Sequence, residues 1–172
     1  MLRLIGVFLL LISSVGTGRW MERREQQRIR QLEEMIRSME YLKGEIRFAR
    51  KTLPESFEQL SERVLSPFQE LFLGLANELK YHPGTGFEEI FKDILDREKE
   101  NFALLTNDME CFYQACCNLG HLDKEMQMHI LDRYIKDLER TVEHLAKEMP
   151  QKTKLYRSLG ILGGVFLVVI LI

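Results

Sequence analysis

The residues of this sequence that come nearest to forming a metal-binding or catalytic cluster are three cysteines and one histidine. Cys111, Cys116 and Cys117 are followed by His121. Thiolates and imidazoles bind zinc, and an ionised thiol is a nucleophile. However, the four residues lack the paired short spacings of a zinc site, and two adjacent cysteines are a poor basis for a disulfide framework. The sequence therefore favours small thiols packed as apolar groups, with a thiol- or metal-dependent enzyme as the alternative.

Two histidines lie beside carboxylates on a segment expected to form a long charged helix. His129 is near Asp132, and His144 follows Glu143. Such a pair could supply a general base if both groups entered a cleft, but an exposed position on a charged helix is favoured. No GxxxxGK[ST] pattern follows a strand, so the sequence carries no phosphate loop. We expect a non-enzymatic protein with no catalytic residue, cofactor or metal.

Both ends of the chain are apolar. One run covers Leu4–Gly18, and the other carries no charge from Ser158 to Ile172. The second run supplies about 15 residues, or ~22 Å of helix, against a hydrocarbon core of ~30 Å, so its helix is expected to begin before Ser158. We therefore expect an N-terminal membrane anchor over residues 1–20 and a C-terminal membrane helix over residues 153–172.

Glycines in the second run could serve the packing of membrane helices. They are Gly160, Gly163 and Gly164. Small residues at this spacing let another helix backbone approach closely. The alternative is that glycine is simply frequent in membrane helices.

Basic residues flank both apolar runs on the side of the central region. The arginines of interest are Arg19, Arg23, Arg24, Arg28 and Arg157. Under the positive-inside rule they place the central region in the cytoplasm, and they could also hold anionic lipid headgroups. The competing interpretation is a secretory signal peptide with small residues at Ser14 and Gly16, which would make this an exported helical protein.

The central region, residues 21–152, has the periodicity of helices and no strand-like alternation. We expect helices over residues 22–51, after Thr52, from Ser66, from Thr85, over 104–119 and from Asp123 to 149. Ser66 with Gln69, and Thr85 with Glu88, resemble capping boxes, and Asp123 can cap the last helix. Pro150 either kinks a continuous helix or separates two. The prediction is an all-α fold: one compact bundle of about six helices, flanked by the two membrane helices.

The expected core follows from residues that recur at steps of three and four. They are Ile29, Leu32, Ile36, Met39, Leu42, Ile46, Ala49, Phe57, Leu60, Val64, Phe68, Leu71, Phe72, Leu75, Leu79, Phe87, Ile90, Phe91, Ile94, Leu95, Leu104, Leu105, Met109, Phe112, Cys116, Leu119, Ile130, Leu131, Tyr134, Leu138, Val142, Leu145 and Met149. The net charge of −2 gives no whole-chain attraction to nucleic acid.

Over essentially its whole length, the chain resembles the stage III sporulation protein AB family. The resemblance rests on the terminal LYRSLGILGGVFLVVILI, the basic residues after a short apolar N-terminus, and the LGHLDKEMQMHI stretch. Within these, Leu119-Gly120 with Asp123 and Gln127 marks a helix-to-helix junction that could be structural or could contact a partner. The chain departs from the family where Ala115-Cys116 replaces a frequent Phe-Gly.

The resemblance implies a membrane protein of endospore-forming bacteria, made in the mother cell. Its bundle would face the cytoplasm at the outer forespore membrane and would be similar to the inner-membrane platform proteins of type II secretion. The implied role is a scaffold in the complex that links mother cell and forespore. The implied partners are the stage III sporulation AA ATPase, other membrane subunits and lipids, and homo-oligomerisation is left open.

Overall fold

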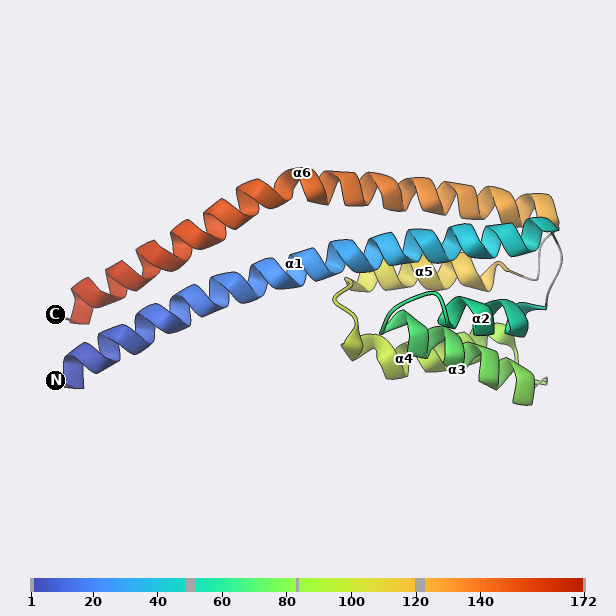
Figure 1. Ribbon diagram of the computed structural model, residues 1–172, viewed down its shortest axis with the longest axis horizontal. Coiled ribbons are helices and arrows are strands. Elements are labelled where there is room, and N and C mark those ends of the chain that lie inside the picture. The colour runs from blue at the N-terminus through green and yellow to red at the C-terminus, as the bar shows by residue number, and fades with distance from the viewer. Residues whose placement is uncertain (1, 49–51, 83, 120–122, 172) are drawn as a thin grey trace. The chain divides into compact units, whose positions relative to one another are not determined.

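All regular secondary structure in the part of the chain that the structure describes is helical. The computed structural model describes residues 2–48, 52–82, 84–119 and 123–171, with the side chains of 2–15, 17, 18, 156, 157, 159–161 and 163–171 excepted. Its elements are α1 (Leu2–Phe48), α2 (Leu53–Ser61), α3 (Phe68–Tyr81), α4 (Phe87–Glu98), the 3₁₀ turn η1 (Lys99–Asn101), α5 (Thr106–Cys117) and α6 (Lys124–Leu171) (Figure 1). The all-α prediction is confirmed.

The chain divides into two units. Residues 30–142 form the first, here called the bundle unit, and residues 1–29 with 143–172 form the second, the end unit. Helices α1 and α6 contribute to both. The sequence predicted a separate membrane anchor and bundle helix at the N-terminal end and left both alternatives open at Pro150, whereas the structure has one helix of 47 residues and one of 48. Pro150 lies inside α6, so it does not separate two helices.

Phenylalanine rings form the centre of the bundle unit. Phe112 of α5 meets the rings of Phe68, Phe72 and Phe91 edge to face, with centroids 6.1, 6.3 and 5.6 Å away. Phe57 of α2 stacks on Phe72 at 5.8 Å. All five side chains are almost completely buried. Aromatic pairs in these geometries contribute beyond their buried area, so this cluster joins α2, α3, α4 and α5.

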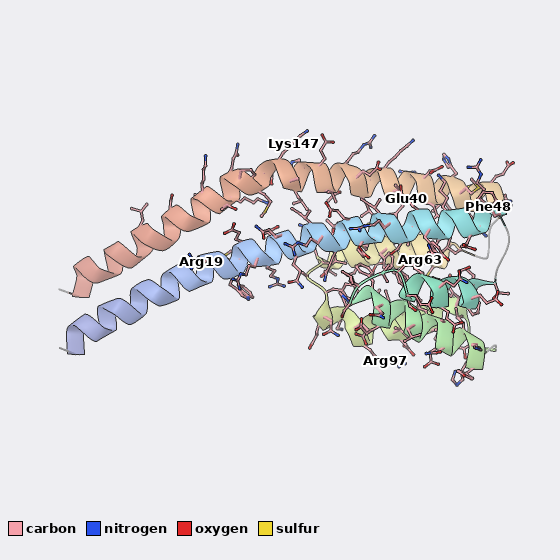
Figure 2. All side chains as sticks on the ribbon, in the orientation of Figure 1. Arg19, Glu40, Phe48, Arg63, Arg97 and Lys147 are labelled. Atoms are coloured by element: carbon pink, nitrogen blue, oxygen red, sulfur yellow. The ribbon has the colours of Figure 1, made fainter. Side chains whose placement is uncertain are left out.

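Among the described residues, several polar contacts attach α1 to the rest of the bundle unit, and four of them are clear. The buried Gln31 accepts a hydrogen bond at its Oε1 from the backbone N–H of Ala103, at 2.7 Å. Tyr41 donates its hydroxyl to Gln59 Oε1 at 3.0 Å, and the Arg63 guanidinium lies 5.0 Å from the centre of the Tyr41 ring (Arg63 is labelled in Figure 2).

The fourth contact joins the two long helices. Lys43 of α1 forms an ion pair with Asp132 of α6, and both side chains are partly exposed. The pair therefore fixes which turns of the two helices are neighbours, while an exposed ion pair of this kind adds little to stability.

Two predicted capping boxes are wrong. Helix α3 begins at Phe68, and the N–H groups of Phe68 and Gln69 donate to the Leu65 carbonyl at 3.0 and 3.3 Å. The backbone of the preceding turn thus replaces the predicted Ser66 cap. Helix α4 begins at Phe87 with Gly86 in the capping position, which leaves Thr85 one residue too early. The half-buried Phe87 ring stacks on Phe57 and Phe91, with centroids 5.9 and 5.7 Å away, so packing of this ring competes with the capping signal.

Two other helix starts agree with the sequence. The Thr52 N–H donates to Glu55 Oε2 at 3.0 Å, with Pro54 in the first turn of α2. Asp123 Oδ1 accepts the Met126 N–H at 2.9 Å at the start of α6. Asp123 directly precedes the first residue of α6, and Glu55 lies in the first turn of α2, so each side chain satisfies a backbone group at the start of its helix.

The expected core is confirmed in its main part, but several expected members, among them Ile36, Ile46 and Leu79, are only half-buried. Phe102 and Ile135 are buried although the pattern left them out. Leu105, expected to face inward, is 52% exposed because it precedes the first residue of α5. Met35, which the periodic pattern left out, is fully buried on α1. It lies between Leu32 and Met39, so the buried stripe of α1 is wider than the pattern predicted.

Within the described residues, no helix is both long enough and apolar enough to cross a membrane. Most side chains of the two apolar runs lie outside those residues. The two membrane helices stay a prediction from the sequence.

We predict that Phe112→Ala destabilises a fragment covering Glu22–Met149 by about 3–5 kcal/mol, because it removes the ring that three others contact and leaves a cavity. Tyr81→Ala, at a ring that is 70% exposed, is the matched control and is expected to change stability by less than about 0.5 kcal/mol. Urea unfolding followed by circular dichroism measures both. Equal effects of the two substitutions would contradict the central role of Phe112.

Candidate functional site

The cysteines do not meet as a reactive cluster in the described residues. Cys111 is exposed, whereas Cys116 and Cys117 are buried on α5. Burial raises the pKa of the Cys116 thiol well above its ordinary value, and burial also raises the pKa of Cys117. A nucleophilic cysteine needs the opposite shift. His121, the fourth predicted member, lies outside the described residues, and no group of three or more metal-binding side chains occurs within them.

The two histidines do not form the carboxylate pairs considered from the sequence. His129 is exposed, and Asp132 pairs with Lys43. His144 Nε2 lies 3.4 Å from Glu148, one turn further along α6, while Glu143 pairs with Lys147 at 2.6 Å. These hydrogen bonds and ion pairs lie on the exposed surface of helices, which is the arrangement that the sequence favoured.

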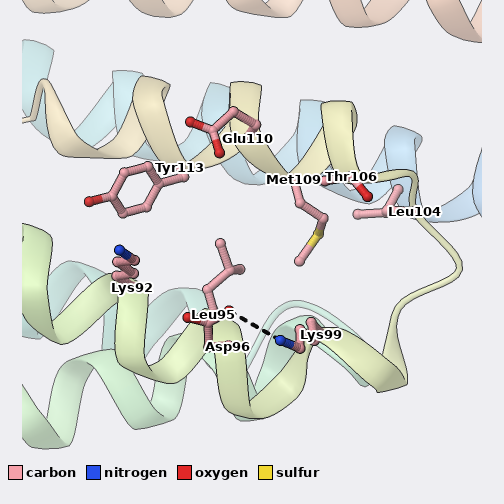
Figure 3. A pocket seen from close by; sticks show the side chains of 9 residues that line it. All are labelled: Lys92, Leu95, Asp96, Lys99, Leu104, Thr106, Met109, Glu110 and Tyr113. Atoms are coloured by element: carbon pink, nitrogen blue, oxygen red, sulfur yellow. Dashed lines mark hydrogen bonds and ion pairs between the residues drawn. The ribbon is translucent and has the colours of Figure 1, made fainter.

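A cavity of about 420 Å³ opens between α4 and α5, and the sequence gave no sign of it. It is lined by Lys92, Leu95, Asp96, Lys99, Leu104, Thr106, Met109, Glu110 and Tyr113 (Figure 3). Lys99 Nζ lies 3.4 Å from Asp96 Oδ1, and both side chains are about 60% exposed. A hydrogen bond with Cys117 raises the pKa of Tyr113 to about 12, so the phenol is not a base near neutral pH. The lining thus combines an apolar floor with solvated charges, without the buried ionisable group typical of a catalytic site.

Two buried polar groups lie where α5 packs against α6. Asp108, 7% exposed, accepts the Leu105 N–H at 2.9 Å and so caps the start of α5. The Tyr134 hydroxyl is buried without a hydrogen-bond partner among the described residues. Burial raises the pKa of Tyr134, and Cys116 and Cys111 add to that shift. The phenol therefore stays neutral, and its position is explained by packing of the ring.

Two residues of the predicted junction between α5 and α6, Leu119 and Asp123, have structural roles. Leu119 is buried, and its N–H donates to the Cys116 carbonyl at 2.9 Å. Asp123 caps α6, and its carbonyl accepts the Gln127 N–H at 3.0 Å. Gln127 is half-buried. Gly120 lies outside the described residues.

In the end unit, α1 and α6 meet at the level where the two apolar runs begin. The Thr153 hydroxyl donates to Glu22 Oε1 at 3.4 Å. Arg19, Arg23 and Arg24 are exposed near this contact, and the Arg24 guanidinium lies 5.5 Å from the centre of the Trp20 ring. Arg28 is half-buried. The structure thus brings the N-terminal basic flank next to the start of the C-terminal one.

The remaining predicted residues belong to α6. The backbone at Arg157, Gly160, Gly163 and Gly164 is helical, and the side chain of Arg157 lies outside the described residues. The proposed packing role of the glycines stays a prediction.

Comparison with known proteins assigns the chain to a family. The model of the family described as stage III sporulation protein AB matches residues 3–172. The chain belongs to the stage III sporulation protein AB family. A relative in this family, stage III sporulation protein AB of Bacillus subtilis (strain 168), is 23% identical over 174 residues, which cover 99% of each chain. Sporulation is therefore the process for which this family is named.

A solved structure shares the family's helical fold. It is the structure of stage III sporulation protein AB (SpoIIIAB), with a TM-score of 0.66 and 18% identity. The match covers 72% of the present chain and 96% of the solved one. At this identity the likeness supports the fold of the family and leaves the role of individual residues open.

Sequence reasoning missed three features of this family member. They are the α4–α5 cavity, the unpartnered Tyr134 hydroxyl, and the contact between Glu22 and Thr153. The first two depend on how helices pack and leave no local pattern. The third joins residues that are distant in sequence, and the matching positions of the two basic flanks are the signal that could have suggested it.

We predict that Asp123→Ala destabilises the Glu22–Met149 fragment by about 1 kcal/mol, because the Met126 N–H loses its acceptor. Asp123→Asn, which keeps a side-chain oxygen, is expected to retain most of the stability. Thermal melting measures both. If partner recovery fell in Asp123→Ala while melting stayed at the wild-type temperature, the junction would be a binding site and the structural explanation would fail.

A second prediction concerns pH. The Cys116 thiol has an ordinary pKa of 9.0 in the unfolded chain and a higher pKa when buried. Above about pH 9 the unfolded state therefore loses a proton that the folded state keeps, and stability falls as pH rises. Cys116→Ala should remove up to about 1.4 kcal/mol per pH unit from that slope.

Denaturant unfolding of the fragment between pH 8 and pH 10.5 measures the slope. Cys111→Ala, at an exposed thiol, is the control and is expected to retain the wild-type slope. An unchanged slope in Cys116→Ala would contradict the assignment.

Proposed function

We propose that this protein is a non-enzymatic membrane platform subunit of a sporulation complex. In this proposal the bundle unit faces the mother-cell cytoplasm at the outer forespore membrane. There it couples the stage III sporulation AA ATPase to the assembly linking mother cell and forespore. Membership in the stage III sporulation protein AB family supports the process, and the all-helical bundle supports a binding role.

The observation that carries the proposal is the contact between Glu22 and Thr153. From Glu22 back to Leu2, α1 extends by about 30 Å, and from Thr153 on to Leu171, α6 extends by about 27 Å. Because both helices continue without interruption and start their apolar runs at the same level, both runs would enter a bilayer of ~30 Å from one face. That arrangement fits two membrane helices with the intervening chain on one side.

The charges of the two units support the same orientation. The end unit holds nine basic and four acidic residues, a net charge of +5, and the bundle unit holds 15 basic and 22 acidic residues, a net charge of −7. Cytoplasmic residues next to membrane helices are enriched in Lys and Arg. An acidic bundle unit is repelled by an anionic membrane surface and stays available to partner proteins.

The burial of Cys116 and Cys117 argues against the thiol-dependent enzyme considered as the alternative. Serine at all three cysteines is expected to leave sporulation intact when the variant folds. Loss of sporulation with unaltered melting of the bundle would favour the enzyme.

We predict that Gly163→Leu or Gly164→Leu lowers recovery of the complex, while the bundle keeps its melting temperature. The added side chain blocks close approach of another membrane helix and lies outside the bundle unit. Val165→Leu, in the same run, removes no glycine and serves as the control. Co-purification of the ATPase and the other membrane subunits from sporulating cells measures recovery. Wild-type recovery from both glycine variants would refute this packing role.

A further inference from the structure

The end unit carries a group of exposed cationic and apolar side chains on α1 and α6, close to where the apolar runs begin. We call it the collar, and its members are Arg19, Trp20, Arg23, Arg24, Lys154 and Leu155. Trp20 is 60% and Leu155 56% exposed.

The collar is set at one level by the contact between Glu22 and Thr153. Arg19 lies three residues from Glu22 on the side of the N-terminal run, and Lys154 lies one residue from Thr153 on the side of the C-terminal run. At ~1.5 Å of rise per residue these positions lie within about one helical turn of each other. Arg19 and Arg23 are four residues apart, so they share one face of α1 (Arg19 is labelled in Figure 2).

Three exposed cations of the collar, Arg19, Arg23 and Lys154, have no carboxylate partner among the described residues. Glu22 accepts from Thr153, and Glu148 is held by Lys152 at 3.0 Å. Among the described residues, no carboxylate forms an ion pair with Arg19, Arg23 or Lys154. Their positive charges are therefore available to an anion from outside the chain.

We infer that the collar binds the anionic headgroups of phospholipids, with contributions from both helices. The inference rests on the proposed membrane location and extends it to a lipid preference. A phospholipid is complementary to both kinds of side chain in the collar, because its phosphate can pair with the cations and its acyl chain can contact Trp20 and Leu155. Tryptophan and the apolar stems of Arg and Lys are suited to this boundary. The Arg24 guanidinium over Trp20 combines both properties in one pair.

The test uses Trp20, because it is the single tryptophan in the chain. The full chain is reconstituted into vesicles that contain brominated phosphatidylglycerol in phosphatidylcholine, or brominated phosphatidylcholine in phosphatidylglycerol. Bromine on the acyl chain quenches tryptophan at contact, so the readout reports lipid and is insensitive to free phosphate. We expect phosphatidylglycerol to be preferred by at least about fivefold, the effect of one basic side chain near an anionic surface.

The variant Arg19→Gln, Arg23→Gln, Lys154→Gln is expected to lower this preference while Trp20 is still quenched. Arg24 is kept, so that the surroundings of the indole ring change little. The control Lys80→Gln, Lys124→Gln, Lys136→Gln removes the same charge from exposed positions of the bundle unit and is expected to keep the preference.

Two outcomes overturn the inference in distinguishable ways. Equal quenching by both brominated lipids, or an undiminished preference in the collar variant, would place Trp20 at the membrane and refute the headgroup site alone. Absence of quenching by either lipid would also contradict the membrane location of the proposed function.

Discussion

The bundle depends on the packing of phenylalanine rings around Phe112. Helices α2, α3, α4 and α5 have 9, 14, 12 and 12 residues, and isolated helices of this length are marginal in water. Each acquires its stability by placing at least one ring in the shared cluster. The contacts of α1 through Gln31 and Tyr41 then attach this aromatic layer to a long helix. Without the ring cluster, helices α2 to α5 would not pack together, and the buried apolar residues of α1 would have no helices to cover them.

Charge is distributed over the two units in a way that a whole-chain value conceals. A net charge of −2 suggests a nearly neutral protein, yet the end unit is basic and the bundle unit acidic. The difference matters physically because electrostatic attraction acts over about a Debye length, ~8 Å at physiological salt. A basic segment can therefore attract an anionic surface locally even though the whole chain is nearly neutral.

Apolar periodicity proved a more reliable guide than capping signals. Stripes such as Leu71, Phe72 and Leu75 are buried as predicted, because burial of several large side chains outweighs any local preference. The boxes at Ser66 and Thr85 failed, since their small stabilisation competes with ring packing and with backbone turns. Asp123 succeeded at a helix start where such competition is weaker.

The sequence by itself determined the all-helical class, most of the buried residues, the apolar ends with their basic flanks, and the family. These features are local or repeat along one helix, so a linear pattern records them. Tertiary structure alone decided that α1 and α6 are single long helices, that Cys116 is buried while Cys111 is exposed, and that α4 and α5 enclose a cavity. It also decided that Glu22 meets Thr153. A contact between residues 131 positions apart depends on the path of the whole chain. The residues next to Glu22 in the sequence do not indicate that Thr153 is its partner, and the residues next to Thr153 do not indicate Glu22.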